Sequence, residues 1–189
     1  MKVLKRIIPK LDIKGPNLVK GLCFDGNRVL GTADYFAEIY DREGADEIFY
    51  QDTVASLYKR NNLISILKNS ATKVSVPITV GGGIRTLADI NKVLRAGADK
   101  VAINTSAIKN LKFVKNAVKK FGSQCIVASL EAKKRENYYE PWYDYGRESS
   151  NKKLEEWCTQ LIDAGVGEIF ISSVDRDGTG QGFDFELVN

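Results

Sequence analysis

Short runs rich in β-branched and aromatic residues alternate along the chain with longer segments of helical period. This alternation predicts parallel strands joined by crossover helices. The predicted strands are Arg6–Asp12, Glu47–Asp52, Pro77–Val80, Lys100–Ile103, Cys125–Glu131 and Glu168–Ser173. The helices expected between them are about Thr32–Glu43, Leu63–Ser70, Thr86–Ala96, Ala107–Phe121 and Lys152–Ala164. Three of these helices end in similar segments, REGADEI, RAGADKV and DAGVGEI, whose glycines suit a left-handed C-cap. Such corners are typical of a βα-repeat protein.

An internal repeat extends the pattern. The segment GADEIFYQD at Gly44 recurs as GVGEIFISS at Gly165, and Asp12 at the end of the first strand corresponds to Glu131 at the end of the fifth. Two four-unit halves make a (β/α)8 TIM barrel, which typically needs about 250 residues. The chain has 189 residues. We therefore expect a single incomplete barrel domain over 1–189, truncated after about six βα units, with halves at about 1–121 and 122–189.

Composition limits the chemistry that this fold can carry. The chain contains no histidine, which excludes a Ser-His-Asp triad, a Cys-His pair and any histidine-ligated metal. The three cysteines are far apart and have no metal-ligand spacing, so we expect no metal and no cofactor. Acid-base work at neutral pH then falls to carboxylates, lysines or water.

Charge and hydropathy limit the partners and the compartment expected for the protein. The net charge of +4 is small and the basic residues are scattered, which predicts no nucleic acid polymer as a partner and is compatible with an anionic substrate. No apolar run is long enough to cross a membrane, and the segment MKVLKRIIPK lacks the features of a signal peptide. We expect a soluble cytoplasmic protein with no membrane partner.

Two glycine- or hydroxyl-rich segments follow neighbouring predicted strands. In TVGGGIRT, backbone N–H groups of three glycines could hold a phosphate, although a glycine turn chosen for positive φ explains the motif equally well. In INTSAIKN, the polar residues Asn104, Thr105 and Ser106 could be simple N-caps. Because the carboxyl ends of barrel strands share one rim, the two segments together favour a phosphate site.

Charged residues occur at both ends of the predicted strands. Asp12 and Glu131 could act as general acid and base across a central pocket, or could be exposed carboxylates paired with lysines, and the pattern favours neither. The segment DRDGTGQG lacks the ligand spacing of a calcium loop. At the opposite strand ends, Arg6, Glu47, Lys100 and Glu168 could be stability features or could surround a closed axial opening.

Six motifs in order, IIPKLDIK, VKG, TVGGGIRT, AGADKVAINTSA, FGSQC and SVDRDGTGQGFDFEL, resemble the cyclase subunit of imidazole glycerol phosphate synthase, the HisF family, over nearly the whole chain. The resemblance implies a (β/α)8 barrel that takes ammonia from a glutaminase partner. It also implies a lyase that cleaves a bis-phosphate ribonucleotide into imidazole glycerol phosphate and aminoimidazole carboxamide ribotide, in histidine biosynthesis.

The resemblance also assigns roles to residues. Asp12 and Glu131 would be catalytic, and Lys20 would belong to a flexible loop that closes over the substrate. The substrate- and phosphate-binding positions would be Asp52, Gly82, Gly83, Asn104, Thr105, Ser172, Asp177 and Gly178. Arg6, Glu47, Lys100 and Glu168 would form an ammonia gate, and Asp99 would lie at the glutaminase interface.

The chain departs from the family pattern at several places. Glu131 replaces an aspartate, and Lys10 replaces the usual cysteine, which should lower the pKa of Asp12 if the ammonium is close. The sequence stops at Asn189, before the two strands that hold the family's second phosphate site. The segment YYEPWYDYGRE differs from the family's hairpin and could be an altered lid or a repacked one.

These departures leave two alternatives to the histidine-pathway enzyme. One is a related subunit of an ammonia-channelling amidotransferase pair that acts in nucleotide-sugar amidation. This alternative is favoured by Glu131, Lys10 and the unusual hairpin. The other is a non-catalytic half-barrel fragment that folds by association, because an open sheet leaves an unpaired edge.

Overall fold

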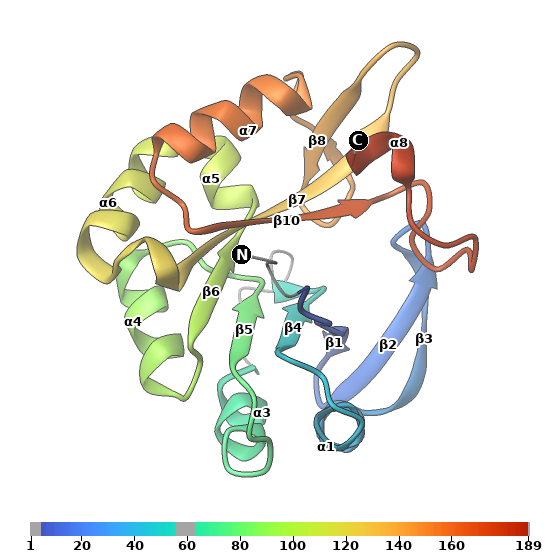
Figure 1. Ribbon diagram of the computed structural model, residues 1–189, viewed down its shortest axis with the longest axis vertical. Coiled ribbons are helices and arrows are strands. Elements are labelled where there is room, and N and C mark those ends of the chain that lie inside the picture. Colours follow the sequence, from blue (N-terminus) through green and yellow to red (C-terminus); the bar gives the residue numbers. More distant parts are fainter. Residues whose placement is uncertain (1–4, 56–62, 189) are drawn as a thin grey trace.

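The computed structural model describes residues 5–55 and 63–188, in which ten strands form one sheet (Figure 1). Six of these strands pair in parallel in the order of the chain: β1 Lys10–Lys14, β4 Ile48–Asp52, β5 Ile78–Gly81, β6 Lys100–Ile103, β7 Ile126–Lys134 and β10 Glu168–Ser173. The expectations attached to Met1–Leu4 and to Asn189 lie outside the described residues. The parallel sheet confirms the predicted α/β class.

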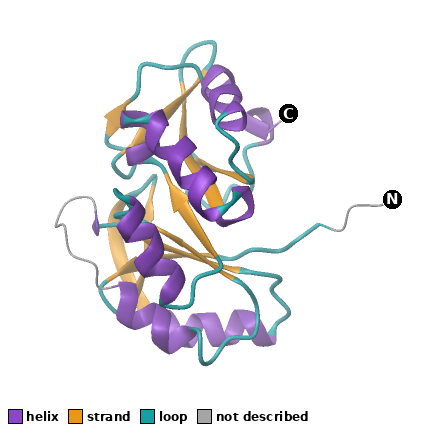
Figure 2. Cartoon of the chain, turned by 90° about the vertical axis from the view of Figure 1, so that its left-hand side faces the viewer, coloured by secondary structure: helices purple, strands orange, loops and turns teal. Residues whose placement is uncertain are grey.

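Helices connect the parallel strands and cover the outside of the sheet (Figures 1 and 2). They are α1 Ala33–Arg42, α3 Leu63–Ser70, α4 Leu87–Arg95, α5 Thr105–Lys109, α6 Leu111–Phe121 and α7 Leu154–Asp163, followed near the end by the short α8 Phe185–Val188. The main core lies between these helices and the sheet, where Leu67, Ile90 and Trp157 are almost fully buried. None of the helices in the described ranges is long and apolar enough to cross a bilayer.

The sheet curls as a barrel does. The rings of Phe49 on β4 and Phe170 on β10 meet edge to face with centroids 4.8 Å apart, although three strands separate β4 from β10 in the sheet. Together with Ala102 and Val127 they form a small apolar cluster on the concave side. The strands that the structure describes do not close the barrel, because β10 pairs only with β7 among them.

Three predicted boundaries are wrong, and one of them is the end of the fifth strand, because β7 continues past Glu131 to Lys134. The first strand begins at Lys10 and not at Arg6, since Pro9 has no N–H with which to extend the ladder. The single helix predicted over Ala107–Phe121 is two helices, because Asn110 leaves helical geometry and its side chain accepts a hydrogen bond from the Phe113 N–H at 3.3 Å. Asparagine is a strong N-cap, and here it starts a new helix.

Antiparallel strands that were not predicted extend the sheet on both sides. After β1, the strands β2 Asn17–Leu22 and β3 Asp25–Thr32 form a hairpin that carries Lys20, which the resemblance had placed in a flexible loop. After β7, the strands β8 Tyr139–Tyr143 and β9 Glu148–Ser149 form a meander. A 3₁₀ turn, η1 Ser123–Cys125, precedes β7.

Candidate active site

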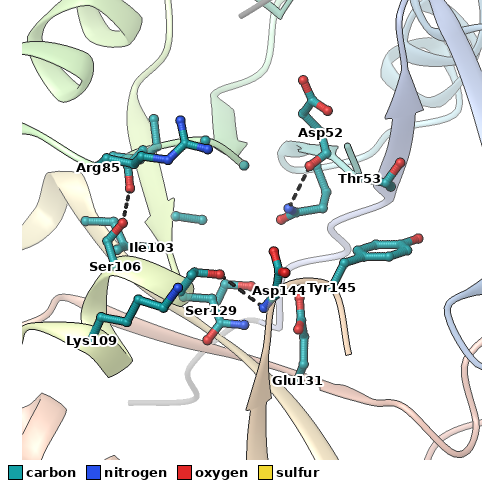
Figure 3. Close-up of a pocket in the computed structure, with 17 residues that line it drawn as sticks. Asp52, Thr53, Arg85, Ile103, Ser106, Lys109, Ser129, Glu131, Asp144 and Tyr145 are labelled. Carbon is teal, nitrogen blue, oxygen red and sulfur yellow. Dashed lines mark hydrogen bonds between the residues drawn. The ribbon is translucent and has the colours of Figure 1, made fainter. Parts of the chain in front are cut away.

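A cavity of about 170 Å³ opens at the carboxyl ends of the parallel strands (Figure 3). Residues after β4, β5 and β6 line it together with residues of β7 and the β8–β9 turn. Six predicted site residues belong to this lining: Asp52, Gly82, Gly83, Asn104, Thr105 and Glu131. The structure thus brings together side chains that the sequence had placed on separate strand ends.

Glycine is required where the chain leaves β5. Gly82 and Gly83 have φ values of +99° and +73°, and a Cβ on Gly82 would lie 2.5 Å from the Asp52 carbonyl oxygen. The N-terminus of α4, in contrast, is occupied, because the Asp89 carboxylate accepts hydrogen bonds from the N–H groups of Arg85 and Thr86. An anion would therefore be held by the glycine turn and not by this helix end.

The polar residues after β6 are hydrogen-bonded directly to β8 and to the β8–β9 turn. The Asn104 side-chain amide donates to the Trp142 carbonyl at 3.1 Å, and the Thr105 hydroxyl accepts from the Asp144 N–H at 3.1 Å. Across the cavity, the Asp52 carboxylate accepts from the Val54 N–H at 2.9 Å, and burial raises the pKa of Asp52. The turn therefore forms one wall of the cavity.

Asp12 lies on β1, only 1% exposed, and is paired with two lysines. The Lys10 Nζ lies 2.9 Å from Asp12 Oδ1, and the Lys20 Nζ lies 3.1 Å from Oδ2 and 2.6 Å from Asp177 Oδ1. Burial disfavours the charge of Lys20, but the Asp12 and Asp177 carboxylates outweigh it and raise the pKa of this lysine. The reading of Asp12 as an exposed carboxylate is wrong, although its pairing with lysines is correct.

Glu131 lies on β7 and is 8% exposed. Burial raises the pKa of Glu131 to about 7, against the opposing effects of a hydrogen bond from the Gly146 N–H at 2.7 Å, the charge of Lys10 and the Asn104 side chain. This carboxyl group therefore titrates near neutral pH. Two carboxyl groups in such different surroundings suit separate acid and base roles.

The sequence reasoning missed the residues of the β8–β9 turn. Asp144 and Tyr145 have φ values of +56° and +59°, and this turn places the Tyr145 ring against the cavity (Figure 3). The ring stacks on Phe24 from the β2–β3 turn, with centroids 4.8 Å apart. The signal in the sequence was the difference of the segment YYEPWYDYGRE from the family pattern, and its residues Asp144 and Tyr145 line the cavity.

A buried carboxylate supports this turn. Glu140, 2% exposed, accepts hydrogen bonds from Arg135 Nε at 2.6 Å, Trp142 Nε1 at 3.1 Å and the Asn151 N–H at 2.8 Å, and Ser149 also donates to it. These bonds tie β8 and β9 to the end of β7. The backbone that reaches Glu131 is thereby held in place.

Ser172, Asp177 and Gly178 lie outside the first cavity. They line a second, more open cavity of about 430 Å³ beside β10, which Lys10 and Lys20 also line. Ser172 is in register with Glu131 on the neighbouring strand. The predicted binding residues are therefore divided between two cavities.

At the opposite ends of the strands, four charged side chains form a closed ring. Arg6 Nη1 lies 2.9 Å from Glu47 Oε2, and Lys100 Nζ lies 2.8 Å from the same oxygen. Arg6 Nη2 and Lys100 Nζ lie 3.1 and 2.7 Å from Glu168. Next to the ring, Asp99 accepts a hydrogen bond from the Ile78 N–H at 2.8 Å. The four side chains that the sequence placed at these strand ends are therefore joined by ion pairs.

A curled parallel sheet with helices outside, and buried acid-base groups at its carboxyl ends, define an enzyme of the βα-barrel class. The described residues contain no cluster of three or more side chains suited to hold a metal ion.

Comparisons with known proteins identify the family. Residues 6–189 match the family model described as histidine biosynthesis protein. The chain is 50% identical over 184 residues to the imidazole glycerol phosphate synthase subunit HisF of Legionella pneumophila, covering 97% of this chain and 87% of that one. It is 45% identical to the same subunit of Campylobacter concisus, covering 97% of this chain and 73% of that one. The chain belongs to the HisF family of histidine biosynthesis proteins, as the sequence motifs predict.

Proposed function

We propose that the protein is the ammonia-dependent cyclase subunit of an imidazole glycerol phosphate synthase, a lyase of histidine biosynthesis that works with a glutaminase subunit. The observation that carries the proposal is the pair of buried carboxyl groups at the carboxyl ends of the strands. Asp12 is held by two ammonium groups, whereas Glu131 has a pKa raised by burial to about 7.

The two carboxyl groups suit the proton transfers of such a reaction. Cleavage of the substrate with insertion of a nitrogen requires a group that takes a proton from the incoming nitrogen and a group that gives one to the departing amine. The ion-paired Asp12 carboxylate fits the base, and Glu131, partly protonated at neutral pH, fits the acid. The covered cavity would keep water from competing with ammonia.

The first cavity fits one phosphate of the substrate. Gly82, Gly83 and the Asn104–Thr105 segment converge on it, and Lys109 adds a positive charge to its lining. Backbone N–H groups beside positive φ glycines form the concave sites that anions occupy. Lys20 and Asp177 would contact the rest of the substrate from the side of the second cavity.

The ring of Arg6, Glu47, Lys100 and Glu168 would form the gate for ammonia. It lies at the strand ends opposite the cavity, and the apolar cluster of Phe49, Ala102 and Val127 lines the concave side of the sheet. Neutral ammonia crosses apolar surroundings more readily than ammonium, because burial disfavours the charged form. The partner glutaminase would dock at this end, where Asp99 lies.

A comparison of two ammonia sources tests the proposal. The protein supplied with ammonium salt should convert the bis-phosphate ribonucleotide to imidazole glycerol phosphate, and Asp12→Asn should abolish turnover. The matched control is Asp99→Asn, which should keep ammonium-driven turnover and lose only turnover driven by glutamine and the glutaminase. A well-folded protein that leaves the substrate unchanged with ammonium would contradict the assignment.

A second candidate function is ammonia transfer in nucleotide-sugar amidation. The observation that favours it is the contact of Lys10 with Asp12, together with the hydrogen bond from Gly146 that occupies Glu131. A changed substrate would relax the requirement for two accessible carboxyl groups and keep the need for ammonia. The same assay with a phosphorylated sugar nucleotide in place of the ribonucleotide distinguishes the two reactions.

A further inference from the structure

Lys10 lies at a largely buried position, where a charged lysine side chain loses hydration. It is the first residue of β1, its side chain is only 15% exposed, and its Nζ lies 2.9 Å from Asp12 Oδ1. The same Nζ lies 5.0 Å from the centroid of the Phe24 ring, on the turn between β2 and β3. Lysine side chains usually extend their ammonium groups into water, and a buried ammonium is retained only when partners compensate for lost hydration. Asp12 and Phe24 are such partners.

Lys10 also acts on the second carboxyl group. Its positive charge opposes the effect of burial on Glu131. Asp144 and Tyr145, both from the β8–β9 turn, also interact with Glu131, and Asp52 lines the same cavity. The ends of β6 and β10 contribute Asn104 and Ser172, which do not ionise. Lys10 is therefore a cation whose charge acts on Glu131, in addition to Arg85 and Lys109, which line the same cavity as Glu131.

The aromatic contact joins Lys10 to the cover of the cavity. Phe24, which lies against the Lys10 ammonium, stacks on Tyr145, and the residue after Tyr145 donates its N–H to Glu131. The Lys10 ammonium thus contacts Asp12 directly and acts on Glu131 by its charge. The stacked rings of Phe24 and Tyr145 also connect it to the turn whose backbone donates a hydrogen bond to Glu131.

We propose that Lys10 is a positioning residue of the active site, which orients the Asp12 carboxylate and adds a positive charge that acts on Glu131. This inference rests on the proposed roles of the two carboxyl groups. Lys10 itself need not touch the substrate.

The consequence of removing the charge follows from its sign. Without Lys10, burial of Glu131 is less compensated, so the carboxyl group keeps its proton to higher pH. Asp12 would keep only Lys20 as a cationic partner. An arginine at this position would preserve both effects, because its guanidinium is always charged.

The test compares Lys10→Met with Lys10→Arg, and Lys10→Gln serves as a second neutral variant. The control is Lys14→Met, which removes a positive charge from the exposed end of the same strand. Carbon-13 NMR of the glutamate carboxyl groups follows the titration of Glu131, which Glu131→Gln identifies by loss of its signal. The pH profile of kcat/KM with ammonium is measured on the same proteins.

In the two neutral variants, the Glu131 titration and the corresponding limb of the pH profile should both move upward by about one pH unit. More of the Glu131 acid is then protonated at pH 7, so any fall in kcat at this pH should come from the lost contact between Lys10 and the Asp12 carboxylate. Lys10→Arg and Lys14→Met should behave as the wild-type protein does. A Glu131 titration that is the same in the neutral variants and the wild-type protein would overturn the proposal, as would a shifted titration with an unchanged pH profile.

The two hypotheses can fail separately. A wild-type protein without turnover would contradict the proposed function, whereas the NMR comparison would still decide whether Lys10 controls Glu131.

Discussion

Replacing Glu131 with glutamine should make the protein more stable at neutral and alkaline pH. Glutamine has nearly the shape of a protonated glutamate, and its carbonyl oxygen can accept the hydrogen bond that the Gly146 N–H donates to Glu131. It cannot ionise. The variant therefore removes the cost of a buried negative charge and keeps the contact.

The size of the effect follows from the raised pKa of Glu131. The carboxyl group titrates at about 7 in the folded protein, against 4.5 for an unperturbed glutamate. Between these pH values the unfolded chain gives up the proton while the folded protein retains it, so the stability of the wild-type protein falls as pH rises. The full difference corresponds to about 3 kcal/mol of unfolding free energy. Below pH 4.5 both states are protonated, and the variant and the wild-type protein should be equally stable.

Urea unfolding at several pH values between 4.5 and 8 measures this difference. The advantage of Glu131→Gln should grow from near zero at the acidic end to about 3 kcal/mol at pH 8. The matched control is Glu140→Gln. Burial raises the pKa of Glu140, but hydrogen bonds from Ser149 and Arg135 outweigh it and lower the pKa, so this variant should be less stable than the wild-type protein at neutral pH and recover as pH falls. Parallel pH dependences for Glu131→Gln and the wild-type protein would refute the reasoning.

Three further changes test other parts of the site. Gly82→Ala would place a methyl group 2.5 Å from the Asp52 carbonyl oxygen, so it should destabilise the turn and weaken binding of inorganic phosphate, measured by calorimetry; unchanged phosphate binding would contradict the role of this turn. Lys100→Met leaves the two glutamates of the ion ring with one cation, so the free energy of unfolding should fall by about 3 kcal/mol in urea titrations. Tyr145→Leu removes the stacked pair of rings and should cost about 1 kcal/mol. Its turn should also exchange amide hydrogens faster, and equal exchange rates would argue against the stacking.

The parallel strands could be predicted because their information is local. Most are short runs of buried residues, glycines follow the helices α1, α4, α6 and α7, and β6 and β10 have the predicted bounds. The β2–β3 hairpin escaped prediction because β3 is largely exposed and shows no apolar alternation. The division between α5 and α6 was hidden because the apolar period continues across Asn110, and only its capping bond breaks the helix.

The candidate site was predictable to the extent that it depends on strand ends. Asp52 ends β4, Asn104 follows β6 and Glu131 lies toward the carboxyl end of β7, and parallel strands bring their carboxyl ends to one rim. Tyr145 could not be found in this way, because it reaches the cavity on a turn held by the Glu140 hydrogen bonds and by stacking on Phe24. Phe24 is distant from Tyr145 in sequence, and their contact is a product of the fold.

The sequence by itself determined which groups can do chemistry: no histidine, two carboxyl groups at strand ends, and a glycine turn. Only the tertiary structure decided the surroundings of the two carboxyl groups. Asp12 lies between two lysines, and burial raises the pKa of Glu131 to about 7. The reason is that a pKa depends on burial and on charges within a few ångströms. At this site the lysine charges lie on β1 and β2, and the β8–β9 turn packs over Glu131.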